Sequence, residues 1–296
     1  MKKHTLNEWI IALRPWSLPA SVMPIVVAVA YLFWIGADIH WPMAGLTLVG
    51  MILFHLTGNV WSDYFDFRKK VDAEDTFGVK TLTSGMFEPR EIKNLAIGLL
   101  AVSVICGLTI FALTGFPVLW IGLAGVACTL LYPFLKYNAL GDLDIILTFA
   151  FLPALGTSFT VTGVIDWTVL YIAIPVGLIT DGILHSNNTR DVSTDARAGI
   201  TTMAMSMGPK ASVWLYSIEM IFPYVWVAVL SMLGFFPIHT VAVFLTLVIA
   251  ISNLNVMWQS LTGGVGVIAD LDVKTANLQL FFSVLLAAAF FLAGIF

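Results

Sequence analysis

The sequence predicts an all-α polytopic membrane protein, a helical bundle of nine transmembrane helices built as one domain over residues 1–296. Hydrophobic residues make up 59% of the chain and charged residues only 11%, whereas soluble domains carry roughly 25% charged residues. Apolar runs close to the ~20 residues that cross a bilayer also recur along the chain. These observations exclude a soluble enzyme. A nucleic-acid-binding protein is excluded too, because the formal net charge is -4.

Nine apolar runs, each ended by a turn signal or a charge, are the predicted membrane spans. In order they cover residues 18–36, 42–62, 94–114, 117–134, 143–163, 168–186, 211–231, 236–256 and 277–296. The fourth run is short for a membrane span, so a count of eight is the alternative.

The distribution of basic residues supports each run in turn, because connections that contain Lys or Arg alternate with connections that contain neither. The connections at residues 36–41, 114–117, 163–167 and 234–240 hold no Lys or Arg. All 14 basic residues fall before the first run or after the second, fourth, sixth and eighth: Lys2, Lys3, Arg14, Arg68, Lys69, Lys70, Lys80, Arg90, Lys93, Lys136, Arg190, Arg197, Lys210 and Lys274. Cytoplasmic loops are enriched in Lys and Arg. We therefore expect an integral membrane protein, placed in a bacterial inner membrane, with a cytoplasmic N-terminus and its C-terminus on the opposite side.

The segment before the first run reads as an interfacial helix rather than a cleaved signal peptide. Arg14 and Pro15 interrupt the apolar run, and no small-residue cleavage pattern follows. Trp9, Ile10 and Leu13 fit a helix that lies at the membrane surface.

A first polar cluster closes the second run, on the basic side of the membrane. At about 100° per residue, Asn59, Asp63 and Asp66 lie within about 60° of one another on a helix. His55, one turn earlier, continues this face into the membrane. Carboxylates are costly at membrane depth, so their presence here indicates a functional site.

A second polar cluster closes the sixth run on the same side. Asn187, Asp191 and Asp195 recur every four residues and share a helical face. The two motifs, at residues 59–66 and 187–195, are therefore pseudo-equivalent, and we expect them to form one shared site.

The chemistry of this shared site is predicted to be metal-dependent binding of a diphosphate. Clustered carboxylates repel one another unless a cation lies between them, and Mg²⁺ prefers hard oxygen ligands and substrate phosphates. Lys80, Lys136 and Arg190 are the candidate direct phosphate contacts. The alternative for either cluster alone is an ordinary solvated helix end. For Asp142 and Asp144, a helix-capping role and a substrate role are equally open.

Four segments of the chain resemble the UbiA superfamily of intramembrane aromatic prenyltransferases. They are residues 12–17 (ALRPWS), residues 136–143 (KYNALGDL), residues 183–191 (ILHSNNTRD), and Asp195 with residues 198–202 (AGITT). The third segment is the most specific. The branch that these segments resemble most contains the 1,4-dihydroxy-2-naphthoate prenyltransferases of menaquinone synthesis and the animal enzyme that forms vitamin K2.

The resemblance implies a role for each candidate residue. Asp63 and Asp66 match the first family motif, N-D-x-x-D, and Asp191 and Asp195 match the second, D-x-x-x-D; these four would be catalytic and would hold Mg²⁺ on the diphosphate. The implied diphosphate contacts are Lys136, Arg190, Lys80, Asn59 and Asn187. The chain departs from the family pattern at Ser62, where the motif usually has Asn, and at Lys70.

The implied reaction is Mg²⁺-dependent transfer of an isoprenyl group from its diphosphate to 1,4-dihydroxy-2-naphthoate with decarboxylation, which gives demethylmenaquinone. The expected partners are therefore an isoprenyl diphosphate, an aromatic acceptor and membrane lipid. Within this enzyme class, the alternative acceptors are 4-hydroxybenzoate, homogentisate and a glyceryl phosphate. From other classes, the alternatives are a cation transporter that uses the deeper Asp181 and an inactive lipid-binding regulator.

Overall fold

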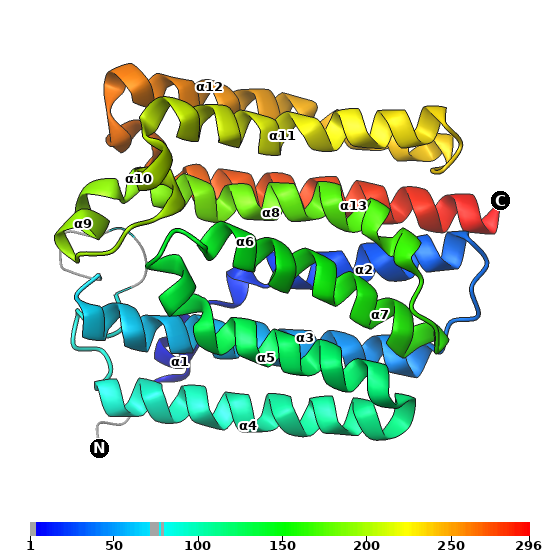
Figure 1. Cartoon of the computed structure of the whole chain (residues 1–296), viewed down its shortest axis with the longest axis horizontal. Helices are drawn as coiled ribbons and strands as arrows, with labels where there is room; N and C mark the ends of the chain where they lie inside the picture. The colour runs from blue at the N-terminus through cyan, green and yellow to red at the C-terminus, as the bar shows by residue number, and fades with distance from the viewer. Residues whose placement is uncertain (1–3, 72–76, 78–79) are drawn as a thin grey trace.

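The computed structural model describes residues 4–71, 77 and 80–296, and within this part the chain is helical with no β-strand. Figure 1 shows the long helices lying side by side along the longest axis of the molecule. The predicted all-α bundle is confirmed.

The helices follow the predicted runs closely. In chain order they are α1 (Leu6–Leu13), η1 (Pro15–Ser17), α2 (Pro19–Trp34), α3 (Trp41–Lys69), α4 (Pro89–Thr114), α5 (Phe116–Lys136), α6 (Gly141–Ile146), the π-helical turn η2 (Leu147–Phe151), α7 (Leu152–Thr162), η3 (Trp167–Val169), α8 (Leu170–Arg190), α9 (Val192–Arg197), α10 (Met203–Met207), α11 (Pro209–Met232), η4 (Ile238–Thr246), α12 (Leu247–Gly263), η5 (Val265–Ile268) and α13 (Leu271–Ile295).

Among the described residues, eight helices or continuous helix pairs are long and apolar enough to cross a bilayer. The N-terminal helices, Leu6–Ser17 and Pro19–Trp34, together form a ninth candidate that bends by 47°. The fourth predicted run, which looked short, is a full helix of 21 residues from Phe116 to Lys136. The predicted count of nine therefore agrees with the structure when the bent pair is one span.

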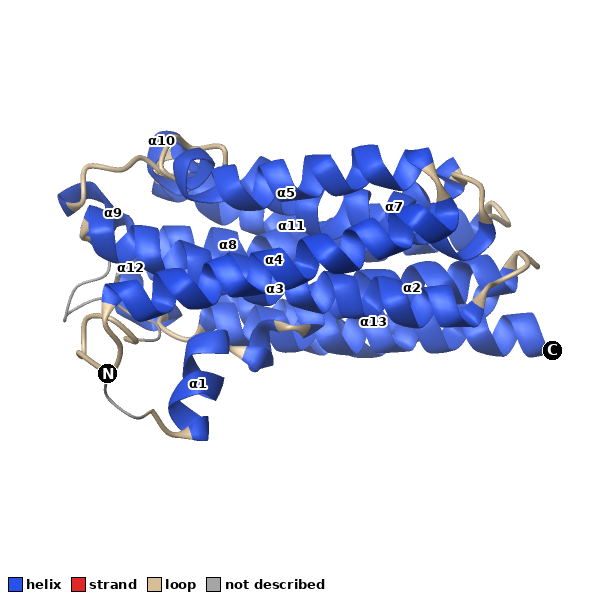
Figure 2. Cartoon of the chain, turned by 90° about the horizontal axis from the view of Figure 1, so that it is seen from below, coloured by secondary structure: helices blue, strands red, loops and turns tan. Residues whose placement is uncertain are grey.

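The N-terminal helix α1 lies beside one end of the bundle rather than along it (Figure 2). Its first turn is closed by a capping box, in which the Thr5 hydroxyl accepts from the Glu8 amide and the Glu8 carboxylate accepts from the Thr5 amide at 2.6 Å. The expected interfacial segment is thus a helix, and its position in the membrane surface stays a prediction.

Helix α8 is the most buried of the spans, whereas α4 and α5 expose most of their surface. Its partners in the core are α2, α11 and α13, which contribute residues such as Tyr216 and Phe282. Close packing of α8 on the π-helical turn depends on Gly177, because a Cβ there would lie 2.5 Å from the Ala150 Cβ. A side chain at this position would push η2 away from α8.

Helices α3 and α8 end at the same end of the bundle, where α9 and α10 also lie (Figure 1). The residues of both polar clusters are carried by these helix ends and by α9. The fold therefore brings together two segments that lie far apart in the sequence.

Candidate active site

A cavity of about 890 Å³ lies in the bundle, with lining residues on α3, α4, α5, α7 and α8. Its middle and far parts are lined mostly by apolar residues and glycine, including Leu108, Leu119 and Gly122. At the end that carries the two clusters, the charged and amide residues that line it include Arg14, Asn59, Asp66, Lys136, Asn187, Asn188, Arg190, Asp191, Asp195 and Asp272. The cavity thus joins a polar end to a long apolar interior.

Asp66 is the carboxylate of the first motif that lines the cavity. Its Oδ2 accepts from the Lys136 ammonium at 3.3 Å, and its Oδ1 accepts from the Tyr137 hydroxyl at 2.7 Å. Ser62, one turn earlier on α3, also lines the cavity and donates to Asp66 at 3.3 Å. The serine that departs from the family motif therefore orients the catalytic candidate.

Asp63, in contrast, is not among the residues that line the cavity. Its carboxylate is paired with the Arg14 guanidinium and accepts from the Thr81 hydroxyl at 3.0 Å. Arg14 adopts a left-handed backbone conformation with φ 52° between α1 and η1, which is strained for a residue with a side chain. This ion pair docks the N-terminal segment on α3.

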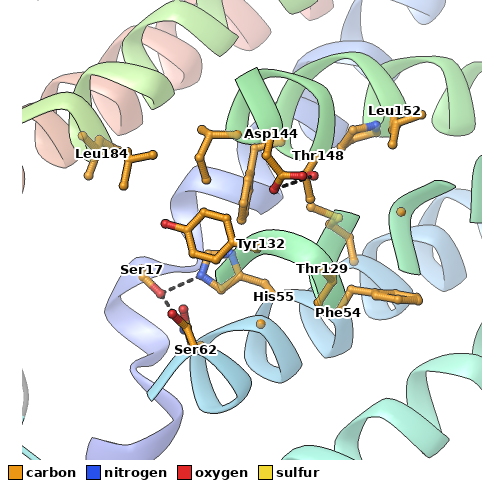
Figure 3. Close-up of a pocket in the computed structure, with 18 of the residues that line it drawn as sticks. Ser17, Phe54, His55, Ser62, Thr129, Tyr132, Asp144, Thr148, Leu152 and Leu184 are labelled. Atoms are coloured by element: carbon orange, nitrogen blue, oxygen red, sulfur yellow. Dashed lines mark hydrogen bonds between the residues drawn. The ribbon is translucent and has the colours of Figure 1, made fainter. Parts of the chain in front are cut away.

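Asn59 contributes to the same docking. Its side-chain nitrogen donates to the Leu13 carbonyl at 3.1 Å and to the Ser17 hydroxyl oxygen at 3.0 Å. The Ser17 hydroxyl in turn lies 2.7 Å from His55 Nε2 (Figure 3). Asn59 and His55 both line the cavity, so this network also forms part of its wall.

The second motif faces the same end of the cavity. Asp191 receives two hydrogen bonds of 2.8 Å from the Arg190 guanidinium, which is the bidentate geometry that favours Arg over Lys. Arg190 also forms an ion pair of 3.3 Å with Asp272 on α13. The candidate phosphate ligand Arg190 is therefore already paired with two carboxylates.

Asp195 on α9 is buried, and burial raises its pKa to about 6. Lys136 opposes this rise in pKa, whereas the nearby Asp191 and Asp66 carboxylates add to it. Lys136 thus acts on both Asp66 and Asp195. The ammonium group therefore interacts electrostatically with one carboxylate of each motif.

The remaining predicted diphosphate ligands differ in their positions. Asn187 lines the cavity, and its Oδ1 is buried with no hydrogen-bond partner among the described residues. Lys80 lies in the segment before α4 and is not among the residues that line the cavity.

These residues provide a suitable donor set for Mg²⁺. In the part of the chain that the structure describes, no three His, Cys, Asp or Glu side chains converge into a metal site by themselves. However, Mg²⁺ in phosphate-binding sites uses one or two carboxylates and takes its other ligands from water and substrate phosphates. Asp66, Asp191, Asp195 and the unpartnered Asn187 oxygen fit that requirement.

The two aspartates of α6 separate into different environments. Asp142 does not line the cavity. One oxygen of its carboxylate lies 3.1 Å from His185 Nδ1, and the other accepts from the Asn188 side-chain amide at 3.5 Å. Asp144 lines the cavity together with Tyr132 and Thr148 (Figure 3). Neither side chain caps α6.

Sequence reasoning gave no role to Arg14 or Tyr137, although both belong to segments that carry the family resemblance. The signal that could have identified Arg14 is its place before Pro15, since a cation that interrupts an apolar run needs a partner. For Tyr137, no signal beyond its position next to Lys136 was present.

The comparisons with known proteins agree with this architecture. The model of the UbiA prenyltransferase family matches residues 21–264. The human UbiA prenyltransferase domain-containing protein 1 is 32% identical over 234 residues, which cover 76% of this chain and 68% of that protein. Its Drosophila melanogaster homolog is 36% identical over 229 residues, which cover 74% and 63%.

Solved structures share the fold at low sequence identity. An apo UbiA homolog from Aeropyrum pernix K1 superposes with a TM-score of 0.69 at 17% identity, covering 93% of this chain and 96% of that chain. A UbiA homolog from Archaeoglobus fulgidus bound to GPP and Mg²⁺ has a TM-score of 0.64 at 14% identity, covering 94% and 99%. With a family model that matches most of its length, the chain belongs to the UbiA prenyltransferase family.

Proposed function

We propose that this protein transfers an isoprenyl group from an isoprenyl diphosphate to 1,4-dihydroxy-2-naphthoate, with Mg²⁺ and with loss of CO₂, as in menaquinone synthesis. The observation that carries the proposal is the 3.3 Å ion pair between Lys136 and Asp66, with Asp195 close enough to interact electrostatically with Lys136, at the polar end of a long apolar cavity. This arrangement suits a ligand with an anionic head and an apolar tail.

The diphosphate head would lie at the polar end of the cavity. Asp66, Asp191 and Asp195 would hold Mg²⁺, and the Asn187 oxygen is available as a further ligand. When bound, Mg²⁺ would neutralise charge on the diphosphate and make it a better leaving group. The binding of GPP and Mg²⁺ by the Archaeoglobus fulgidus homolog supports this assignment.

The protein's own basic groups would stabilise the charge that develops as the allylic C–O bond breaks and the diphosphate leaves with the bonding electrons. Lys136 is preorganised for this by Asp66, which holds it in the cavity at 3.3 Å. The apolar interior excludes water, so the allylic cation is not lost by hydrolysis. Aromatic faces such as Phe149 and Tyr132, which line the cavity, would stabilise the cation.

The acceptor ring would then form a C–C bond through its carboxyl-bearing carbon. The bond from that carbon to the carboxylate breaks, CO₂ leaves, and the electron pair returns to the ring, which restores aromaticity. The choice of 1,4-dihydroxy-2-naphthoate rests on the segments at residues 136–143 and 183–191. Among other acceptors, 4-hydroxybenzoate, homogentisate and a glyceryl phosphate remain the alternatives.

The location that we propose is a bacterial inner membrane with the polar end of the cavity on the cytoplasmic side. The distribution of Lys and Arg supports the orientation. The curated relatives named above are animal proteins, so the type of membrane is tested by locating the protein in its own cells.

The reaction is tested with detergent-purified protein, 1,4-dihydroxy-2-naphthoate and a labelled isoprenyl diphosphate, with Mg²⁺ or with excess EDTA, and the products are analysed by mass spectrometry. We expect demethylmenaquinol, the aromatic hydroquinone that this step gives, detected at its own mass or as the demethylmenaquinone that forms when air oxidises it, and the product should disappear in EDTA. Product with 4-hydroxybenzoate or another acceptor alone would overturn the acceptor and retain the reaction class. No product with any acceptor, from a folded and lipid-supplemented sample, would overturn the enzymatic proposal.

A further inference from the structure

One carboxylate that lines the cavity has no role in the proposed diphosphate site. Asp144 on α6 lines the cavity and is 3% exposed. It is separate from the set formed by Asp66, Lys136 and Asp195, and none of the described basic residues pairs with it. A carboxylate at membrane depth without a cation is costly, and such groups are retained for function.

The hydrogen bonds of Asp144 are incomplete. Its Oδ1 makes no hydrogen bond of normal geometry among the described residues, and its Oδ2 has a long contact of 3.5 Å with the Thr148 hydroxyl. The other nearby donor is the Cys128 thiol, which is a weak one. An ionised carboxylate can accept about four hydrogen bonds, so this group is short of donors in the absence of a ligand.

Within α6, Asp144 has this deficit and Asp142 does not. Two positions earlier on the same helix, Asp142 is equally buried but has His185 and Asn188 as partners. Asp142, which packs between helices, thus has hydrogen-bond donors beside it, whereas Asp144, which faces the cavity, has few.

The surroundings of Asp144 fit a flat, apolar ring. Ile145 and Phe149 line the same cavity, and Figure 3 shows Tyr132, His55 and Leu184 on its wall together with Asp144. Asp144 lies on the last turn of α6, shortly before the π-helical turn η2, from which the Thr148 hydroxyl reaches back to it. Single π-helical turns are frequent at functional sites because they re-aim side chains.

We propose that Asp144 binds a phenolic hydroxyl of the aromatic acceptor, which donates a hydrogen bond to the carboxylate and so fixes the ring in the cavity. The inference rests on the proposed function and extends it, because it names the residue that recognises the acceptor. The hydrogen bond also increases the electron density of the ring, which favours attack on an allylic cation. Conversely, Asp144 repels an anionic group at the same place, so the acceptor's hydroxyl and not its carboxylate faces α6.

The test combines a variant with acceptor analogues. Asp144→Asn keeps the shape of the side chain and removes its charge, and Asp166→Asn is the matched control because Asp166 does not line the cavity. The acceptors are 1,4-dihydroxy-2-naphthoate and its two monomethyl ethers, each of which lacks one hydroxyl donor. The readouts are kcat/KM for the acceptor, KM for the isoprenyl diphosphate, and equilibrium binding of the acceptor by quenching of Trp fluorescence.

For the wild type, we expect one of the two ethers to lose about 10- to 100-fold in kcat/KM, the range for a hydrogen bond to a charged group. Asp144→Asn should lose a similar factor with the parent acceptor and should no longer distinguish the parent from that ether. Its KM for the isoprenyl diphosphate should stay within about threefold of the wild-type value. Asp166→Asn should keep the wild-type preference.

Two results would overturn the inference. One is a wild type that uses both ethers as well as the parent, which needs no variant and so does not depend on whether Asp144→Asn folds. The other is a folded Asp144→Asn protein that keeps the wild-type preference for the hydroxyl. Failure of the proposed function would look different: the wild type would not turn over 1,4-dihydroxy-2-naphthoate, while binding of hydroxylated rings would still be weakened by Asp144→Asn.

Discussion

Replacing Lys136 tests whether one ammonium group serves both aspartate motifs. Lys136→Met keeps the length of the side chain and removes the charge that lies 3.3 Å from Asp66 Oδ2. At an effective dielectric constant of about 20, that separation corresponds to about 5 kcal/mol of direct attraction. The Lys136 and Asp66 side chains keep 16% and 11% exposure, so solvent screens part of this attraction.

We expect Lys136→Met to lower kcat/KM for the isoprenyl diphosphate by about 10²- to 10³-fold, the usual cost of removing one preorganised group that stabilises developing charge. Lys136→Arg should retain more activity than Lys136→Met, because it restores the charge with a different shape. The matched control is Lys210→Met, since Lys210 is exposed at the start of α11 and does not line the cavity.

The assay is initial-rate kinetics in lipid nanodiscs with a labelled isoprenyl diphosphate, after thermal unfolding has shown that each variant is folded. A folded Lys136→Met protein with kcat/KM within tenfold of the wild-type value would refute the reasoning. The diphosphate would then depend on cations other than Lys136.

Three further predictions test other parts of the structure. Asp66→Asn should lower turnover at least 10²-fold, and because Lys136 keeps Asp195 as a nearby carboxylate, it should cost less stability than Asp63→Asn. Asp63→Asn should cost about 1–3 kcal/mol, because it leaves a partly buried guanidinium without its charged partner; equal unfolding temperatures would contradict this. Because the pKa of Asp195 is raised to about 6, the metal-free protein should lose stability as pH rises from about 4 to 6. The affinity for Mg²⁺ should rise through the same range. Thermal shift measures both pH dependences, and both should be flattened in Asp195→Asn. Gly177→Ala should destabilise the protein by about 1–3 kcal/mol, since the new Cβ would meet Ala150 at 2.5 Å. The control is Gly122→Ala, where a new Cβ would have nothing within 4 Å. Equal stabilities of the two variants would show that α8 and η2 are not tightly packed.

The bundle and the shared end of the two motifs could be predicted from the sequence because they depend on strong, additive signals. Each span contributes many apolar residues, and the alternation of basic and uncharged connections fixes which helix ends lie together. A count wrong by one would have placed Asp66 and Asp191 at opposite ends. The structure places both on the wall of one cavity.

Which residue of a motif faces the cavity could not be predicted, because this depends on contacts between distant segments. On a helix, Asn59, Asp63 and Asp66 share a face to within about 60°, which is too coarse to decide which of them faces the cavity. Arg14 decides it by pairing with Asp63. Similarly, only the packing of α6 on α8 separates Asp142, which meets His185, from Asp144, which faces the cavity.

The charges at the polar end of the cavity lead to a last prediction, that the diphosphate binds only together with divalent cations. The basic residues that line this end are Arg14, Lys136 and Arg190, and the acidic ones are Asp66, Asp191, Asp195 and Asp272, so three positive and four negative charges give a net charge of -1. Each cation is also already paired with a carboxylate.

A highly charged anion that entered this site alone would therefore gain little. Coordination of Mg²⁺ is worth several kcal/mol of charge stabilisation, so removing the metal should weaken binding of a non-reactive isoprenyl thiodiphosphate by 10²-fold or more. The measurement is isothermal titration of the nanodisc-embedded protein with this analogue, in Mg²⁺ and in EDTA. Equal affinity in both buffers would mean that the basic residues release their carboxylates and bind the diphosphate directly, and the assignment of the aspartates as metal ligands would then be wrong.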